Sequence, residues 1–169
     1  MIMMKTILIF LLILNFKLHA DDDIYVLEAF LKLTVTGEVV LSDEKNYYRT
    51  IKLEGSWKDN LGQIGTTIAS GRVQTESENL SIEVITKSVD ENGDKFWAFV
   101  KRRIGDLDSG GGGTLEYIDG TGKYKALIGK KCNYATRYIG NRNFHIQKCK
   151  FSKDLIACLL YTSDAADEL

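Results

Sequence analysis

Two cysteines flank the clearest structural signal in the sequence. Two β-rich runs, Asn133–Ile139 and Arg142–Lys148, are joined by Gly140-Asn141, which is typical of a two-residue hairpin turn. With Gly140 and Asn141 as the two turn residues, the residues that pair across the hairpin have numbers that sum to 281. Cys132 and Cys149 are such a pair. Alternation from the turn makes them a non-hydrogen-bonded pair, with Cα atoms about 4.5–5.5 Å apart, which a disulfide can bridge. The sequence therefore predicts a Cys132–Cys149 disulfide.

The same register places a histidine among polar and aromatic neighbours. His145 falls opposite Thr136 and shares one face of the hairpin with Tyr134, Tyr138 and Gln147. If this face points into a barrel, it forms a lumen that could bind a small amphipathic molecule or move a proton. If it points outward, His145 is a solvated cross-strand neighbour with no special role. These five residues are the candidate lumen or ligand residues.

Other groups that could do chemistry do not form a recognisable site. The sequence contains no G-x-S-x-G, H-E-x-x-H or Walker motif and no Cys/His nucleophile pair, and a zinc site would need more ligands. The segment Gly105–Gly113 is expected to be a flexible loop, and its glycine run Gly110–Gly113 lacks the Lys-Ser/Thr of a phosphate loop. Glu83 and Glu116 lie in strand patterns and are expected to face outward. We therefore predict no catalytic residue, no metal and no cofactor.

Strand signals dominate the elements that would position these residues. Leu80, Ile82 and Val84 alternate with polar residues in the period-2 pattern of a half-buried strand. Turn signals recur about every ten residues in the second half, including Asp90–Gly93 and Asp119–Gly122. This spacing predicts an all-β antiparallel meander that closes as a small barrel, because closure removes exposed strand edges. Two segments complete the interpretation: residues 123–131 are expected to form a strand, and residues 27–32 fit either a helix or a strand.

Two short motifs resemble known barrel families. Gly120-Thr-Gly-Lys-Tyr124, with Ile128-Gly129, resembles the G-T-G-x-[FY] hairpin of the allene oxide cyclase and dirigent barrels. This resemblance implies about eight strands and a small apolar ligand, but the motifs that carry those families' catalytic carboxylates are not found here. Gly55-Ser-Trp57 resembles the lipocalin G-x-W motif. The chain as a whole resembles small exported bacterial proteins rich in Lys, Ile and Asn.

The two ends of the chain are expected to lie outside the folded domain. Residues 1–20 predict a secretory signal peptide, with Lys5 before the apolar run Thr6–Leu14 and a cut after Ala20. That run is shorter than the roughly 20 residues that span a bilayer. Cys158 to Glu168 resembles a translated sequencing adaptor, so we treat residues 158–169 as read-through that is not native. The expected organisation is a signal peptide at 1–20 and one barrel domain at 21–157.

Composition narrows the function classes. The chain has 169 residues, with 22 Lys+Arg against 23 Asp+Glu and 44% hydrophobic residues, which suits one domain without a basic face for nucleic acid. We expect a secreted or periplasmic protein with no stable membrane insertion, and nothing in the sequence indicates its oligomeric state. The expected function is a non-enzymatic binding module for a small apolar or amphipathic ligand. The alternatives are an isomerase or cyclase of the allene oxide cyclase type and a structural envelope protein with a filled barrel.

Overall fold

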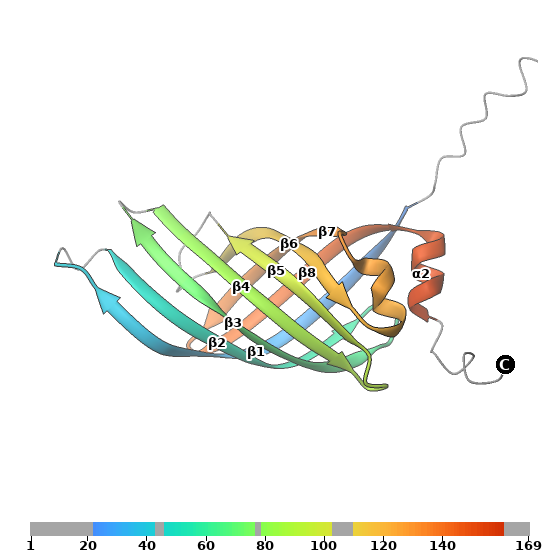
Figure 1. Ribbon diagram of the computed structural model, residues 1–169, viewed down its shortest axis with the longest axis horizontal. Helices are drawn as coiled ribbons and strands as arrows, with labels where there is room; N and C mark the ends of the chain where they lie inside the picture. The colour runs from blue at the N-terminus through green and yellow to red at the C-terminus, as the bar shows by residue number, and fades with distance from the viewer. Residues whose placement is uncertain (1–21, 43–45, 77–78, 103–109, 161–169) are drawn as a thin grey trace, which may run out of the picture.

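Eight strands make up most of the computed structural model, which describes residues 22–42, 46–76, 79–102 and 110–160. The strands alternate in direction along the chain, and two short helices lie at one end of the molecule (Figure 1). The strands are β1 (Asp22–Val40), β2 (Tyr47–Asp59), β3 (Ile64–Glu76), β4 (Asn79–Asp90), β5 (Lys95–Arg102), β6 (Gly110–Gly120), β7 (Lys131–Ile139) and β8 (Arg142–Ser152). The helices are the 3₁₀ helix η2 (Gly122–Leu127) and α2 (Lys153–Leu160).

The sheet closes on itself. Each strand pairs antiparallel with the next, and β1 pairs with β8 from Asp22–Ser152 to Lys32–Arg142, so the order β1 to β8 forms a closed barrel. This confirms the predicted all-β antiparallel meander and barrel. Residues 27–32, for which helix and strand were both open, lie within β1.

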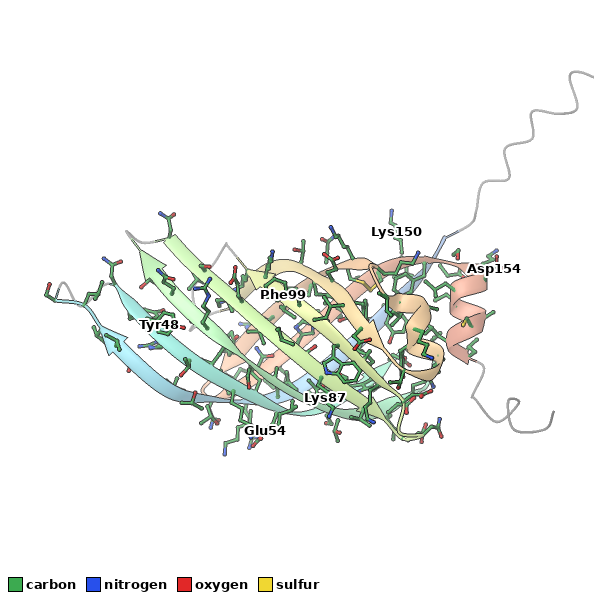
Figure 2. All side chains as sticks on the ribbon, in the orientation of Figure 1. Tyr48, Glu54, Lys87, Phe99, Lys150 and Asp154 are labelled. Carbon is green, nitrogen blue, oxygen red and sulfur yellow. A yellow bond between two sulfur atoms is a disulfide. The ribbon has the colours of Figure 1, made fainter. Side chains whose placement is uncertain are left out.

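Side chains alternate between the interior and the solvent along the strands. In β2, for example, Ile51 and Leu53 are buried, whereas Glu54 is exposed. Glu54 and Lys87 lie on the outer side of the ribbon (Figure 2). The inward-facing side chains form one core, which includes Tyr25, Leu27, Leu31, Ile51, Leu53, Trp57, Val73, Leu80, Ile82, Val84, Phe96, Leu115 and Tyr117.

The predicted disulfide is present. Cys132 and Cys149 are bonded, with Cα atoms 4.7 Å apart, and both side chains are buried. The strand register around them is the one predicted: Asn133 lies opposite Lys148, and Ile139 lies opposite Arg142. Gly140 in the connecting turn has a φ of +58°, a left-handed conformation that glycine adopts at little cost.

The prediction of a flexible loop was wrong for the glycine run, because Gly110–Gly113 are the first residues of β6. The glycines allow a close approach that other residues would prevent. A Cβ on Gly113 would lie 2.2 Å from the Lys101 carbonyl oxygen and 2.8 Å from the ring of Tyr134. The rest of the predicted loop, residues 105–109, lies outside the described residues.

A second expectation was also wrong: residues 123–131 do not form a strand. The chain instead forms η2 across one end of the barrel, and only Lys131 belongs to β7. Tyr124 and Leu127 in η2 are fully buried. Both large side chains point into the end of the barrel and close it. A strand with one face in solvent would not bury both of them completely, and this explains why the segment is helical.

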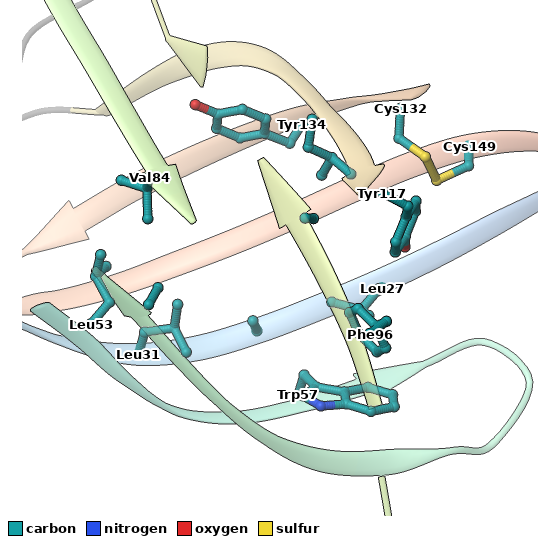
Figure 3. Close-up of a cluster of buried hydrophobic side chains, with 14 of the residues drawn as sticks. Leu27, Leu31, Leu53, Trp57, Val84, Phe96, Tyr117, Cys132, Tyr134 and Cys149 are labelled. Atoms are coloured by element: carbon teal, nitrogen blue, oxygen red, sulfur yellow. A yellow bond between two sulfur atoms is a disulfide. The ribbon is translucent and has the colours of Figure 1, made fainter. Parts of the chain in front are cut away.

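Aromatic rings fill the end that η2 covers. Phe96 packs against Trp57, Tyr117 and Tyr124, with ring centroids 4.9–5.6 Å apart. Figure 3 shows Trp57, Phe96 and Tyr117 together, with the disulfide to one side. Helix α2 lies outside this end, runs three residues past the expected domain boundary at 157, and buries Leu159 completely.

Polar contacts hold the helical cap to the strands. The Gln63 side chain accepts a hydrogen bond from the Tyr124 hydroxyl at 2.7 Å and donates one to the Leu159 carbonyl at 2.5 Å. Lys123 in η2 pairs with Asp90 at the end of β4, with Nζ and Oδ2 3.0 Å apart and side chains 4% and 1% exposed.

Within the described residues, no helix has the length and apolar character needed to cross a membrane.

Loss of the disulfide should lower stability without changing the fold. We expect the Cys132→Ser/Cys149→Ser double variant to lose roughly 3 kcal/mol of unfolding free energy, because the bridge restricts the unfolded chain. Urea unfolding followed by circular dichroism measures this loss. Cys158→Ser, which removes an exposed free thiol on α2, is the control and should leave stability unchanged. Equal stability of all three proteins would contradict the structural role of the bridge.

Removing one charge of the buried pair should cost more than removing both. Asp90→Asn keeps an Oδ1 that can accept the backbone hydrogen bonds from Asn92 and Asp94, but it leaves the Lys123 ammonium buried without its carboxylate. We expect a loss of roughly 3–5 kcal/mol, largely recovered in Asp90→Asn/Lys123→Met. Thermal and urea unfolding measure both variants. A double variant as unstable as Asp90→Asn would show that charge burial is not the cause.

Candidate functional site

All five candidate residues of the hairpin face the inside of the barrel. A cavity of about 80 Å³ lies in the interior beyond the aromatic end, and Tyr134, Thr136, Tyr138, His145 and Gln147 all line it. They meet there because Thr136 pairs with His145 and Tyr134 with Gln147, and inward positions recur every second residue. The structure thus brings the whole candidate set to one cavity. Its role in ligand binding stays a prediction.

The two halves of the barrel give this cavity two different walls. One half supplies mainly aliphatic side chains to what we call the apolar wall: Leu27, Ala29 and Leu31 from β1, Ile51 and Leu53 from β2, Ala69 from β3, and Ile82 and Val84 from β4. The other half supplies the polar wall, Arg102 from β5, Tyr134, Thr136 and Tyr138 from β7, and Asn143, His145 and Gln147 from β8, together with the apolar residues Phe96, Ala98, Val100 and Leu115. Three hydroxyl groups on the apolar side also reach the cavity: those of Thr67 and Ser88 hydrogen-bond each other at 2.6 Å, and that of Thr86 donates to the Ala98 carbonyl at 3.4 Å.

His145 sits in an environment that disfavours its charged form. Its ring stacks on Tyr134, with centroids 4.9 Å apart and planes 23° from parallel. Burial lowers the pKa of His145 to about 4, and a side-chain hydrogen bond with Gln147 only partly opposes this shift. The imidazole is therefore neutral at neutral pH and offers one donor and one acceptor nitrogen.

The tyrosines of the polar wall are also held neutral. Burial raises the pKa of Tyr134 to about 12, although the nearby charge of Arg102 acts in the opposite direction. Burial likewise raises the pKa of Tyr138, against the charge of Arg102 and hydrogen bonds from Asn143, Thr136 and Arg102. Their hydroxyl groups are thus hydrogen-bonding groups and not bases.

Gln147 connects the cavity to the filled end of the barrel. Its amide nitrogen donates to the Tyr117 hydroxyl and lies 3.7 Å from the Cys149 sulfur. Burial raises the pKa of Tyr117, so this phenol stays protonated. Gln147 therefore forms the polar floor of the cavity, directly above the aromatic cluster.

Two members of the polar wall were missed from the sequence, Arg102 and Asn143. Arg102 continues the inward alternation of Phe96, Ala98 and Val100 along β5, and this period was the available signal. Asn143 lies opposite Tyr138 and donates to the Thr136 hydroxyl at 2.5 Å. Counting two residues back from His145 would have found it.

Glu83 and Glu116, the two strand carboxylates that were expected to face outward, both do so. Glu83 pairs with Arg72 across the outer surface at 2.8 Å, and Glu116 lies 3.5 Å from Lys131. The Asp90 carboxylate accepts backbone hydrogen bonds from Asn92 and Asp94 within the turn that the sequence predicts at Asp90–Gly93. Among the described residues that line the cavity, none is Asp or Glu.

Comparison with known proteins adds no relative. No protein-family model, no curated protein and no solved structure matches this chain.

Titration of His145 should make the fold less stable in mild acid. Its pKa in the folded state lies below the ordinary value of about 6.5, so the unfolded chain takes up the proton first as the pH falls. We expect a stability loss of up to about 3 kcal/mol between roughly pH 6.5 and pH 4. Urea unfolding across this range, compared with His145→Gln, isolates the contribution. An NMR pKa near 6.5 for His145 would contradict the buried environment.

Proposed function

We propose that this chain is an exported binding protein that holds a small amphipathic ligand inside its barrel. The observation that carries the proposal is the division of one cavity into an apolar wall and a polar wall. Sites for small molecules commonly combine a mostly apolar lining with a few convergent polar groups. Here the guanidinium, phenol, amide and imidazole groups come from β5, β7 and β8, so they would fix the orientation of a ligand whose apolar part lies against the other half of the barrel.

Rigid placement of the polar wall supports the same function. Tyr134 and Thr136 lie on β7, which is covalently tied to β8 by the disulfide, and His145 and Gln147 lie on β8. Side chains on paired strands keep their positions better than side chains on loops. A site of this kind could bind a ligand without a large rearrangement.

The alternative functions receive less support. An isomerase of the allene oxide cyclase type, suggested by Gly120-Thr-Gly-Lys-Tyr124, would need a group that moves protons or stabilises charge. His145 is the candidate for that role, but a pKa of about 4 makes it a weak base at neutral pH. A purely structural barrel would have an interior filled by side chains. The aromatic end is filled in this way, whereas the part of the barrel beyond it retains the cavity.

Export is part of the proposal. The expected signal peptide, residues 1–20, lies outside the described residues, as do residues 161–169 of the expected adaptor read-through. A structural disulfide is compatible with an oxidising compartment, and disulfides of this kind are rare in the cytosol. The intact mass of the exported protein would report the cut after Ala20 and the state of the cysteines.

Filling the cavity should abolish binding while leaving the fold intact. Ala98 lines the cavity, and Ala98→Leu places three more carbon atoms in it. We expect this variant to bind small alcohols such as 1-butanol at least tenfold more weakly than the unmodified protein, as measured by ligand-observed NMR. Ala135→Leu makes the same change on the exposed face of β7 and should bind normally. Equal binding by both variants would refute the lumen site.

A further inference from the structure

The balanced total charge of the chain conceals an uneven distribution along it. From Gly120 to Lys153 the sequence contains no Asp or Glu, although the whole chain has 23 such residues. The same segment, which covers η2, β7 and β8, contains the basic residues Lys123, Lys125, Lys130, Lys131, Arg137, Arg142, Lys148, Lys150 and Lys153. This part of the fold therefore carries a local excess of positive charge.

The β7–β8 hairpin presents five of these cations on the outside of the barrel. Its inward positions hold the disulfide and most of the polar wall, so the alternate positions face solvent. Of the ten outward positions five are basic, four are apolar, one is Asn and none is acidic. Figure 2 shows one of the cations, Lys150, pointing away from the barrel. We call this surface the basic face, formed by Lys131, Asn133, Ala135, Arg137, Ile139, Arg142, Phe144, Ile146, Lys148 and Lys150.

Carboxylates on the neighbouring strands offset little of this charge. Lys131 lies 3.5 Å from Glu116 of β6. On β1, the Glu28 carboxylate already pairs with Lys58 of β2 at 3.1 Å, and two aspartates begin the strand at the cap end of the hairpin. Within the described part of the chain, four cations of the basic face form no ion pair: Arg137, Arg142, Lys148 and Lys150.

The strand register brings like charges together on this face. Asn133 pairs with Lys148, and the same register places Lys131 opposite Lys150. Like charges that lie directly opposite each other destabilise a sheet, so the stability of the hairpin does not explain them. A surface with one sign of charge does attract anions from solution.

Large apolar side chains lie exposed among these cations. Ile139, next to the hairpin turn, is 66% exposed, and Phe144 is 40% exposed. Phe144 lies opposite Arg137 and packs edge to face against Phe30 of β1, with ring centroids 5.7 Å apart. Ile24, which is 57% exposed, extends the apolar set along β1. Exposed apolar side chains that gather beside polar ones indicate an interaction site.

We propose that the basic face adsorbs to the surface of a bilayer that contains anionic phospholipids. Lys and Arg side chains are attracted to the negative surface potential of such a bilayer. Ile139 and Phe144 enter the boundary between head groups and acyl chains, where burial of apolar surface strengthens binding. A nucleic acid attracts the same cations through its phosphates but offers Ile139 no apolar layer. The adsorption is reversible, uses the outside of the barrel and goes beyond the proposed function of the cavity.

Vesicles of stated composition test the partner. One set contains phosphatidylcholine with about 30% phosphatidylglycerol, and the other contains phosphatidylcholine alone. In about 0.05 M NaCl we expect the protein to bind the anionic set at least tenfold more tightly, as measured by co-sedimentation. About 0.5 M NaCl should remove most of this binding, because salt screens exposed charges. Equal binding to both sets, or binding to neither, would overturn the proposal.

Paired charge variants test the face. Each cation near an anionic surface contributes about fivefold to binding, so Lys148→Gln/Lys150→Gln should bind anionic vesicles at least tenfold more weakly. Lys87→Gln/Lys101→Gln removes two exposed charges from β4 and β5, which lie across the closed barrel from β8, and should bind within twofold of the unmodified protein. Equal weakening in both variants would show that net charge decides binding and would refute the basic face.

Ile139→Ser separates a bilayer from a nucleic acid. We expect this variant to bind anionic vesicles at least threefold more weakly, because it loses an exposed apolar side chain at the turn, and to unfold at the same temperature as the unmodified protein. A short DNA duplex should bind the unmodified protein more weakly than anionic vesicles do. Duplex binding as tight as vesicle binding, with no effect of Ile139→Ser on either, would assign the face to nucleic acid and overturn the proposal.

Discussion

Pairing between β1 and β8 is the interaction on which the rest of the structure depends. It joins the first and last strands from Asp22–Ser152 to Lys32–Arg142 and removes both free edges of the sheet. Once the sheet is closed, each inward side chain is surrounded on all sides by the others. An open sheet with the same alternation would leave Arg102 and His145 facing water. Closure converts a polar face of a hairpin into a desolvated wall.

Side-chain size then divides the closed interior into two parts. At one end Trp57, Phe96, Tyr117 and Tyr124 fill the space, and η2 covers them. Ala98 lies two residues after Phe96 along β5 and lines the cavity, as do Ala29 on β1 and Ala69 on β3. The cavity is therefore a consequence of residue volume along the strands, while the backbone of the barrel is continuous through both parts.

The parts of the fold that local chemistry determines could be predicted from the sequence. The Gly140-Asn141 turn fixes the register of its hairpin, and this register alone yielded the disulfide and the common face of Tyr134 and His145. Which face points inward could not be predicted, because both faces mix polar and apolar residues and only closure decides between them. Arg102 was missed for a related reason: a charge at a strand end is normally solvated. The glycines of β6 were misread because close backbone packing leaves no trace in composition.

Burial acts on the ionisable groups of the polar wall according to the chemistry of each side chain. His145 can release its proton, so burial lowers its pKa and leaves it neutral. Tyr134 and Tyr138 can also lose a proton, but burial raises their pKa and keeps them protonated. Shared burial therefore leaves neutral hydrogen-bonding groups on this wall, not a pair of titrating groups suited to acid–base exchange. This arrangement favours hydrogen bonding over proton transfer, and it follows from the chemistry of these side chains once the barrel encloses them.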